Sequence, residues 1–139
     1  MSDSEELAEI RERKREALER KLRGEDTADT TATPTTPVTI GSSGEFDGFV
    51  STHDLVLVDF HADWCGPCRM LEPTVERLAH ESAAAVAKID IDAHQGLASQ
   101  YGVRSVPTLL LFADGEPVER VVGVRGFDEL ASLLESHGA

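Results

Sequence analysis

The residues of this chain whose type and spacing could do chemistry are its two cysteines. Cys65 and Cys68 lie in DWCGPC (63–68), with Gly66 and Pro67 between them. Such a pair could be half of a zinc site, a structural disulfide, or a dithiol that is oxidised and reduced in turn. Zinc would need two more ligands, and neither a second cysteine pair nor paired histidines supply them, so no metal site is predicted. Redox exchange is the favoured interpretation.

The position of the pair supports exchange. The apolar run LVLVDF (55–60) predicts a buried strand just before it, and Pro67 suits the first turn of a helix. Cys65 then lies at a helix N-terminus, where free backbone N–H groups and the helix dipole favour a thiolate. Cys68 follows on the same side of the first turn, so the two sulfurs can meet. We expect Cys65 to be exposed and activated and Cys68 to be more buried.

These cysteines must be positioned by alternating strands and helices, which begin at Val38. Such alternation, ending in a hairpin at Asp114-Gly115, predicts an α/β domain with a mixed sheet over 38–139. Met70 is expected on the apolar side of the helix after the cysteines, and Pro73 is expected to kink that helix. The predicted strands are 38–40, 55–60, 85–91, 108–112 and 117–122, and the predicted helices are 44–51, 67–82, 94–100 and 127–137.

Two further segments precede this domain. Residues 1–23 have seven acidic and seven basic side chains, and Ser2 with Glu5 forms a capping box, so they predict a polar helix. This helix is either solvated on all sides or a weak docking or dimerising element; we expect a monomer, with weak dimerisation as the alternative. Residues 24–37 are rich in threonine and proline and predict a flexible linker.

The charge of the chain restricts its partners. A formal net charge of −13, from 26 acidic and 13 basic residues, disfavours binding to nucleic acid and to anionic membranes. There is neither an apolar run of the ~18 residues that span a bilayer nor a signal-peptide pattern, so export is not supported. Only three of the basic residues are lysines. An acidic, lysine-poor composition suits a cytosol of very high salt, and we infer a halophilic origin.

The segment VDFHADWCGPCRM resembles the active-site segment of the thioredoxin family. AKIDID and VRSVPTLLLFADGEPVERVVG follow in the family's order and spacing, and the similarity covers residues 38–137. The resemblance implies the thioredoxin fold, in which helices flank a central mixed sheet. It also implies a cytoplasmic protein-disulfide reductase that acts on disulfide-containing proteins and is recharged by a thioredoxin reductase. Neither a metal nor a bound cofactor is expected.

Two charged residues join the cysteines as catalytic candidates. Asp59 is a lone acid at the end of an apolar strand; burial there would raise its pKa and suit a proton acceptor for Cys68. The alternative is an exposed carboxylate at the strand end. Lys88 is the only lysine of the domain and resembles the family's lysine that lies beside the buried aspartate. The alternative is a side chain that points into solvent.

A substrate-docking surface follows from the resemblance. Pro107 corresponds to the family's cis-proline that faces the cysteines, and Val106 would offer its backbone to an extended substrate segment. Gly123 would leave room for the substrate backbone, or would simply end a strand. Trp64 would be part of the docking surface, or would only pack. The complete set of predicted substrate-binding residues is Trp64, Gly66, Pro67, Val106, Pro107 and Gly123.

One position departs from the family pattern. His61 replaces an aromatic residue, often tryptophan, and could tune thiol acidity or pH dependence. A packing role is the favoured interpretation, and the remaining histidines are expected on the surface. A second hypothesis for the whole chain is a redox-dependent binding module, in which the N-terminal helix docks a partner and the thiols only switch its affinity.

Overall fold

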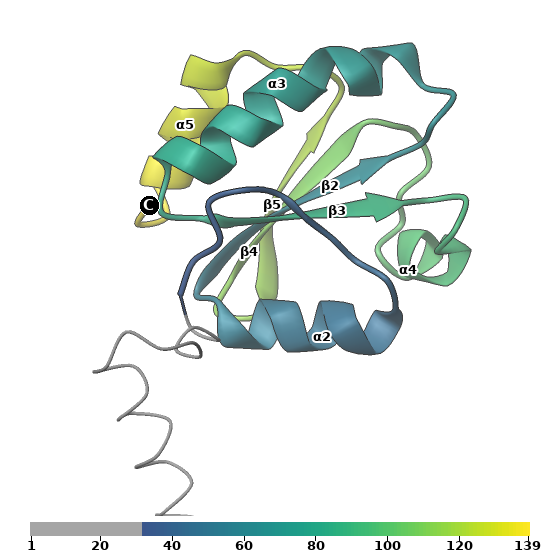
Figure 1. The fold of residues 1–139 in the computed structure, drawn as a ribbon, viewed down its shortest axis with the longest axis horizontal. Coiled ribbons are helices and arrows are strands. Elements are labelled where there is room, and N and C mark those ends of the chain that lie inside the picture. The colour runs from purple at the N-terminus through teal and green to yellow at the C-terminus, as the bar shows by residue number, and fades with distance from the viewer. Residues whose placement is uncertain (1–31) are drawn as a thin grey trace, which may run out of the picture. The chain divides into compact units, whose positions relative to one another are not determined.

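A computed structural model of the chain describes residues 32–139. The predictions for residues 1–23 and for most of the linker 24–37 lie outside these residues. The described part forms a five-stranded sheet with helices on both faces (Figure 1). In chain order its elements are β1 (Val38–Thr39), α2 (Ser43–Thr52), β2 (Leu55–His61), α3 (Gly66–Glu81), β3 (Ala85–Asp90), α4 (Gln95–Gln100), β4 (Thr108–Ala113), β5 (Glu116–Val122) and α5 (Phe127–Glu135).

The sheet is mixed, as predicted, and its strand order is β1-β3-β2-β4-β5. Strands β1, β3 and β2 are parallel to one another. Strand β4 runs antiparallel to β2, and β5 runs antiparallel to β4. The central strand β2 is buried from Leu55 to Phe60. A strand that is covered on both faces needs apolar side chains in both directions, and this is why LVLVDF is an almost continuous apolar run.

The two faces of the sheet carry separate cores. On one face, α2 packs Phe46 against Tyr101 and Phe112, with all three ring pairs edge to face. Helices α3 and α5 lie on the other face (Figure 1), and they pack leucines such as Leu71 and Leu130 onto the sheet. Successive side chains of a strand alternate between these faces, so each residue of β2 belongs to one core or to the other.

Helix α3 follows the cysteine loop and runs continuously through Pro73. Its buried residues are Cys68, Leu71, Val75, Leu78 and Ala79. The prediction for Met70 is wrong, because this side chain is 70% exposed. At about 100° of rotation per residue, the buried residues of α3 span about 100° of the helix surface, and Met70 lies about 80° outside this arc.

The hairpin between β4 and β5 turns at Asp114 and Gly115, as predicted. Both residues have positive φ, 52° and 85°, the backbone conformation that two-residue hairpin turns require. His137 lies at the surface, as expected, but it is partly buried: its Nε2 lies 2.9 Å from Oε2 of Glu119, and its side chain is 25% exposed. Among residues 32–139, the helices are too short or too polar to cross a membrane.

Candidate active site

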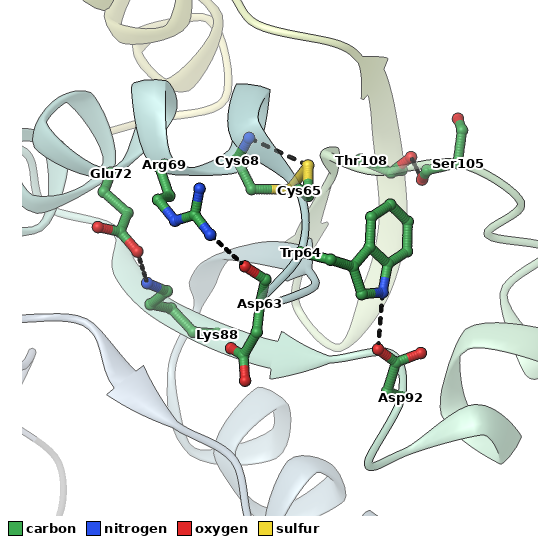
Figure 2. Close-up of a disulfide and its surroundings, with 10 residues drawn as sticks. All are labelled: Asp63, Trp64, Cys65, Cys68, Arg69, Glu72, Lys88, Asp92, Ser105 and Thr108. Atoms are coloured by element: carbon green, nitrogen blue, oxygen red, sulfur yellow. Dashed lines mark hydrogen bonds and ion pairs between the residues drawn. A yellow bond between two sulfur atoms is a disulfide. The ribbon is translucent and has the colours of Figure 1, made fainter.

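Cys65 and Cys68 form a disulfide at the start of α3, with their Cα atoms 5.3 Å apart. Cys65 is the N-cap of this helix, as the sequence predicts, and its Sγ accepts a hydrogen bond of 3.1 Å from the backbone N–H of Cys68 (Figure 2). Pro67 lies in the first turn, where no N–H is needed. The first turn of α3 therefore directs its N–H groups and its positive dipole end at the sulfur of Cys65.

The expected difference in exposure between the two cysteines is not present in this disulfide form. Cys65 is 3% exposed and Cys68 is 4% exposed. Both belong to a small apolar cluster with Ala62, against which Ile91 and Val106 pack. The bond between the sulfurs holds both in this cluster, so the predicted exposure of Cys65 is wrong for the oxidised protein.

Asp59 lies in β2 and is 1% exposed, which excludes the surface alternative. Burial raises the pKa of Asp59 to about 6, Lys88 acts in the opposite direction, and Glu72 adds to the rise. Oδ1 of Asp59 has no hydrogen-bond partner among residues 32–139, so no donor of these residues stabilises a negative charge on that oxygen. A carboxyl group of this kind can take up and release a proton near neutral pH.

Lys88 lies opposite Asp59 in the register of the parallel strands β3 and β2. Its side chain is only 19% exposed, so the solvent-pointing alternative is wrong. Nζ of Lys88 lies 3.5 Å from Oε2 of Glu72 in α3, and Figure 2 shows this ion pair beside the cysteines. The ammonium group is therefore in contact with the half-exposed carboxylate of Glu72, while its charge also lowers the pKa of the buried Asp59.

His61 ends β2 on the same face as Asp59, two residues further along the strand. Burial lowers the pKa of His61, and Lys88 lowers it further, whereas Asp90, Asp63 and Glu72 act in the opposite direction. The ring is therefore neutral at neutral pH, which agrees with the packing interpretation.

The indole ring of Trp64 stands next to the disulfide on the outside of the protein (Figure 2). It is 67% exposed, so Trp64 is not a packing residue of the core. Its Nε1–H donates a hydrogen bond of 2.9 Å to Oδ2 of Asp92, just after β3. This bond fixes the orientation of a large apolar surface directly beside the reactive sulfurs.

The loop before β4 completes the surroundings of the cysteines. The peptide bond between Val106 and Pro107 is cis, as the resemblance implies, and Val106 packs against the cysteine cluster. Gly123 donates its N–H to the carbonyl oxygen of Pro107 at 2.9 Å and has a φ of +94°. A side chain at Gly123 would be strained, and its Cβ would lie 3.3 Å from Nη1 of Arg125. Val106 thus touches the cysteine cluster directly, and Gly123 is tied to the same loop through Pro107.

Three residues that the sequence analysis missed also contribute: Glu72 pairs with Lys88, Asp92 holds Trp64, and Arg69 donates to the carbonyl oxygen of Asp63 at 2.7 Å. Of these three residues, only Glu72 could have been identified from the sequence, because it lies four residues, or one helical turn, beyond Cys68. Within residues 32–139, no three side chains of histidine, cysteine, aspartate or glutamate gather as a metal site would require.

A disulfide at a helix N-terminus, packed against a cis-proline loop and preceded by a strand with a buried carboxyl group, is typical of a dithiol–disulfide oxidoreductase. The family model described as thioredoxin matches residues 37–136, and the chain belongs to the thioredoxin family. It has the thioredoxin fold and reduces protein disulfides through the Cys65–Cys68 pair.

Individual relatives agree with this assignment. A thioredoxin of Chlamydia caviae is 48% identical over 101 residues, which are 72% of this chain and 98% of the relative. A thioredoxin of Staphylococcus aureus is 43% identical over 98 residues, 69% of this chain and 93% of the relative. The structure of a variant thioredoxin from Halobacterium salinarum is 57% identical, with a TM-score of 0.75, and the match covers 78% of this chain and 96% of that one. This last similarity supports the halophilic origin that the acidic composition indicates.

Proposed function

We propose that Cys65 is the attacking nucleophile of disulfide reduction and that Cys68 is the resolving thiol. The observation that carries this assignment is the hydrogen bond from the N–H of Cys68 to Sγ of Cys65 at the start of α3. In the reduced protein the same N–H and the helix dipole stabilise a thiolate on Cys65. Cys68 is inside the first turn and within reach of that sulfur, but it is not the atom at which the helix N-terminus is directed.

The reaction then proceeds in two exchanges. The Cys65 thiolate attacks one sulfur of the target disulfide, forms a mixed disulfide, and releases the other target sulfur as a thiolate. The Cys68 thiolate next attacks Sγ of Cys65, which forms the Cys65–Cys68 disulfide and releases the second target thiolate. Two electrons pass from the protein to the target, so the target is reduced and the protein is oxidised.

Asp59 is the proposed proton acceptor for Cys68. With a pKa of about 6 it is largely ionised at neutral pH and can take the thiol proton as Cys68 attacks. Lys88, opposite Asp59 on the neighbouring strand, favours the charged carboxylate and so sets how strong a base Asp59 is.

Trp64, Gly66, Pro67, Val106, Pro107 and Gly123 are the proposed docking surface for the target. Gly66 and Pro67 begin α3 between the cysteines and are exposed. The backbone of Val106 is offered to an extended target segment, Trp64 supplies apolar contact area, and Gly123 keeps the approach open.

The proposal extends to the protein's cellular setting. We place it in the cytoplasm as a monomer, recharged by a thioredoxin reductase, with its thioredoxin domain at 38–139 after the helix 1–23 and the linker 24–37. The family assignment supports the reductase, and the net charge of −13 supports the exclusion of nucleic acid and membranes as partners.

A turnover assay tests these roles. With a small dithiol as electron source and a disulfide-bonded protein as substrate, Cys65→Ser should be inactive. Asp59→Asn should form the mixed disulfide at the normal rate but resolve it more slowly. Normal turnover by Cys65→Ser would overturn the assignment of the nucleophile, and normal resolution by Asp59→Asn would remove Asp59 from the mechanism.

A further inference from the structure

Glu72 is a charged residue of the cysteine helix that the reaction above does not use. It lies one turn beyond Cys68 in α3, so both side chains leave the helix on the same side. Its Oε2 lies 3.5 Å from Nζ of Lys88, and its side chain is 50% exposed, whereas that of Lys88 is 19% exposed. Figure 2 shows the ends of the Glu72 and Lys88 side chains directed at each other.

Lys88 therefore has two carboxyl neighbours. Asp59 is its register partner on β2, and Asp59 and Lys88 both point to the face of the sheet that α3 covers. An ammonium group between a buried carboxyl group and a half-exposed one divides its attraction between them, and the geometry of the Glu72 pair decides how much reaches Asp59.

The elements packed around Asp59 differ in whether they supply groups that bear on its charge. Strand β3 supplies Lys88, and helix α3 supplies Glu72 and Cys68. Its own strand supplies His61, whose ring is neutral because burial lowers the pKa of His61. Strand β4 places the uncharged Leu109 opposite Asp59. Helix α5 contributes Leu130 and Leu134 to this core. The charge balance at Asp59 thus depends on Lys88 and Glu72.

We propose that Glu72 is a positioning residue that holds Lys88 away from Asp59 and so preserves Asp59 as a proton acceptor. Without the Glu72 carboxylate, the Lys88 ammonium group would turn to Asp59 and stabilise its ionised form. Asp59 would then be a weaker base toward Cys68. The effects of Lys88 and Glu72 on the pKa of Asp59 have these directions, since Lys88 lowers it and Glu72 raises it. The consequence for catalysis rests on the proposed role of Asp59.

The first test is the variant Glu72→Gln in the full-length oxidised protein. When the Asp59 carboxyl carbon is titrated by NMR, the midpoint should move to lower pH by about 1 pH unit. This is the smaller end of the range by which a nearby positive charge, here Lys88, lowers the pKa of a carboxyl group. The matched control is Glu76→Gln, which removes an equal charge from an exposed position one turn further along α3 and should leave the midpoint unchanged. An unchanged midpoint in Glu72→Gln would overturn the proposal.

A double-mutant cycle with Lys88→Met then shows whether Glu72 acts through Lys88. In the Lys88→Met background, Glu72→Gln should move the Asp59 midpoint by less than half as much as it does in the wild type. Equal shifts in both backgrounds would mean that Glu72 acts only by its own charge, and the positioning role would be wrong. A merely structural ion pair would alter the melting temperature but not the Asp59 titration.

The pH dependence of resolution separates this proposal from the proposed function. If Asp59 is the base, the acid limb of the resolution rate in Glu72→Gln should move with the Asp59 midpoint. A moved midpoint with an unmoved rate profile would support the positioning role of Glu72 and overturn the role of Asp59 as base. An unmoved midpoint overturns the role of Glu72 whatever the rate profile.

Discussion

Replacing Asp59 by asparagine removes an ionisable group that the fold keeps from solvent. An aspartate carboxyl group in water has a pKa of 3.8, whereas that of Asp59 has a pKa of about 6 in the folded protein. The folded state therefore binds more protons than the unfolded state in this window, and stability falls as the pH rises through it. The cost of ionising the buried Asp59 does not affect stability below pH 3.8, and it is fully present above about pH 6. There, the difference of about 2 units between the two pKa values lowers the free energy of unfolding by about 3 kcal/mol.

Asparagine cannot ionise, so Asp59→Asn escapes this penalty. Relative to the wild type, its free energy of unfolding should rise by about 2–3 kcal/mol between pH 4 and pH 8. Burying the amide adds a cost or gain that does not depend on pH, and comparing the two pH values removes it. The assay is urea unfolding of both oxidised proteins at constant high salt.

Asp54→Asn is the matched control, since Asp54 is exposed and directly precedes the same strand. It should show no comparable pH-dependent gain. If the advantage of Asp59→Asn were the same at both pH values, the carboxyl group would not be desolvated as described, and its suitability as a base near neutral pH would lose its physical basis.

The remaining predictions concern the core, the docking surface, the salt response and the N-terminal segment. Phe46→Ala should lower the free energy of unfolding by about 3–5 kcal/mol in urea, because a fully buried ring would leave a cavity. Trp64→Ala should raise KM for a disulfide-bonded protein about tenfold with little change for a small disulfide, while the exposed control Val118→Ala should change neither. The protein should melt at a lower temperature in low KCl than in multimolar KCl, and equal melting temperatures would contradict the halophilic adaptation. Deleting residues 1–37 should leave reduction of a generic disulfide unchanged; lost reduction would contradict the two-part organisation, and lost complex formation with intact chemistry would support the binding-module hypothesis.

The strands and the cysteine pair could be predicted because their constraints are local. A strand covered on both faces must be apolar throughout, as LVLVDF is, and the turn at Asp114-Gly115 needs residues that tolerate positive φ. Cys65 as a helix N-cap follows from Pro67 and the preceding strand. The roles of Asp59 and Pro107 were less accessible, because they depend on burial and on a cis peptide bond that only the family resemblance implied.

What could not be predicted depends on neighbours that are distant in the sequence. The ion pair of Glu72 with Lys88 joins a helix to a strand, and an exposed glutamate on a helix has no pattern that identifies its partner. Met70 lies outside the buried face of α3, and the apolar character of its side chain alone does not reveal which way the helix turns it. Cys65 is buried in the oxidised form because the disulfide and Val106 cover it, which a helix-terminus argument does not include.

The unequal roles of the two sulfurs are the central claim, and intact-protein mass spectrometry tests them most directly. Reduced Cys68→Ser should form one mixed disulfide per protein with a disulfide-bonded peptide, located at Cys65. Reduced Cys65→Ser, treated in the same way at neutral pH, should form none on the same timescale. Equally fast adduct formation on Cys68 in the second variant, or no adduct on Cys65 in the first, would contradict the account.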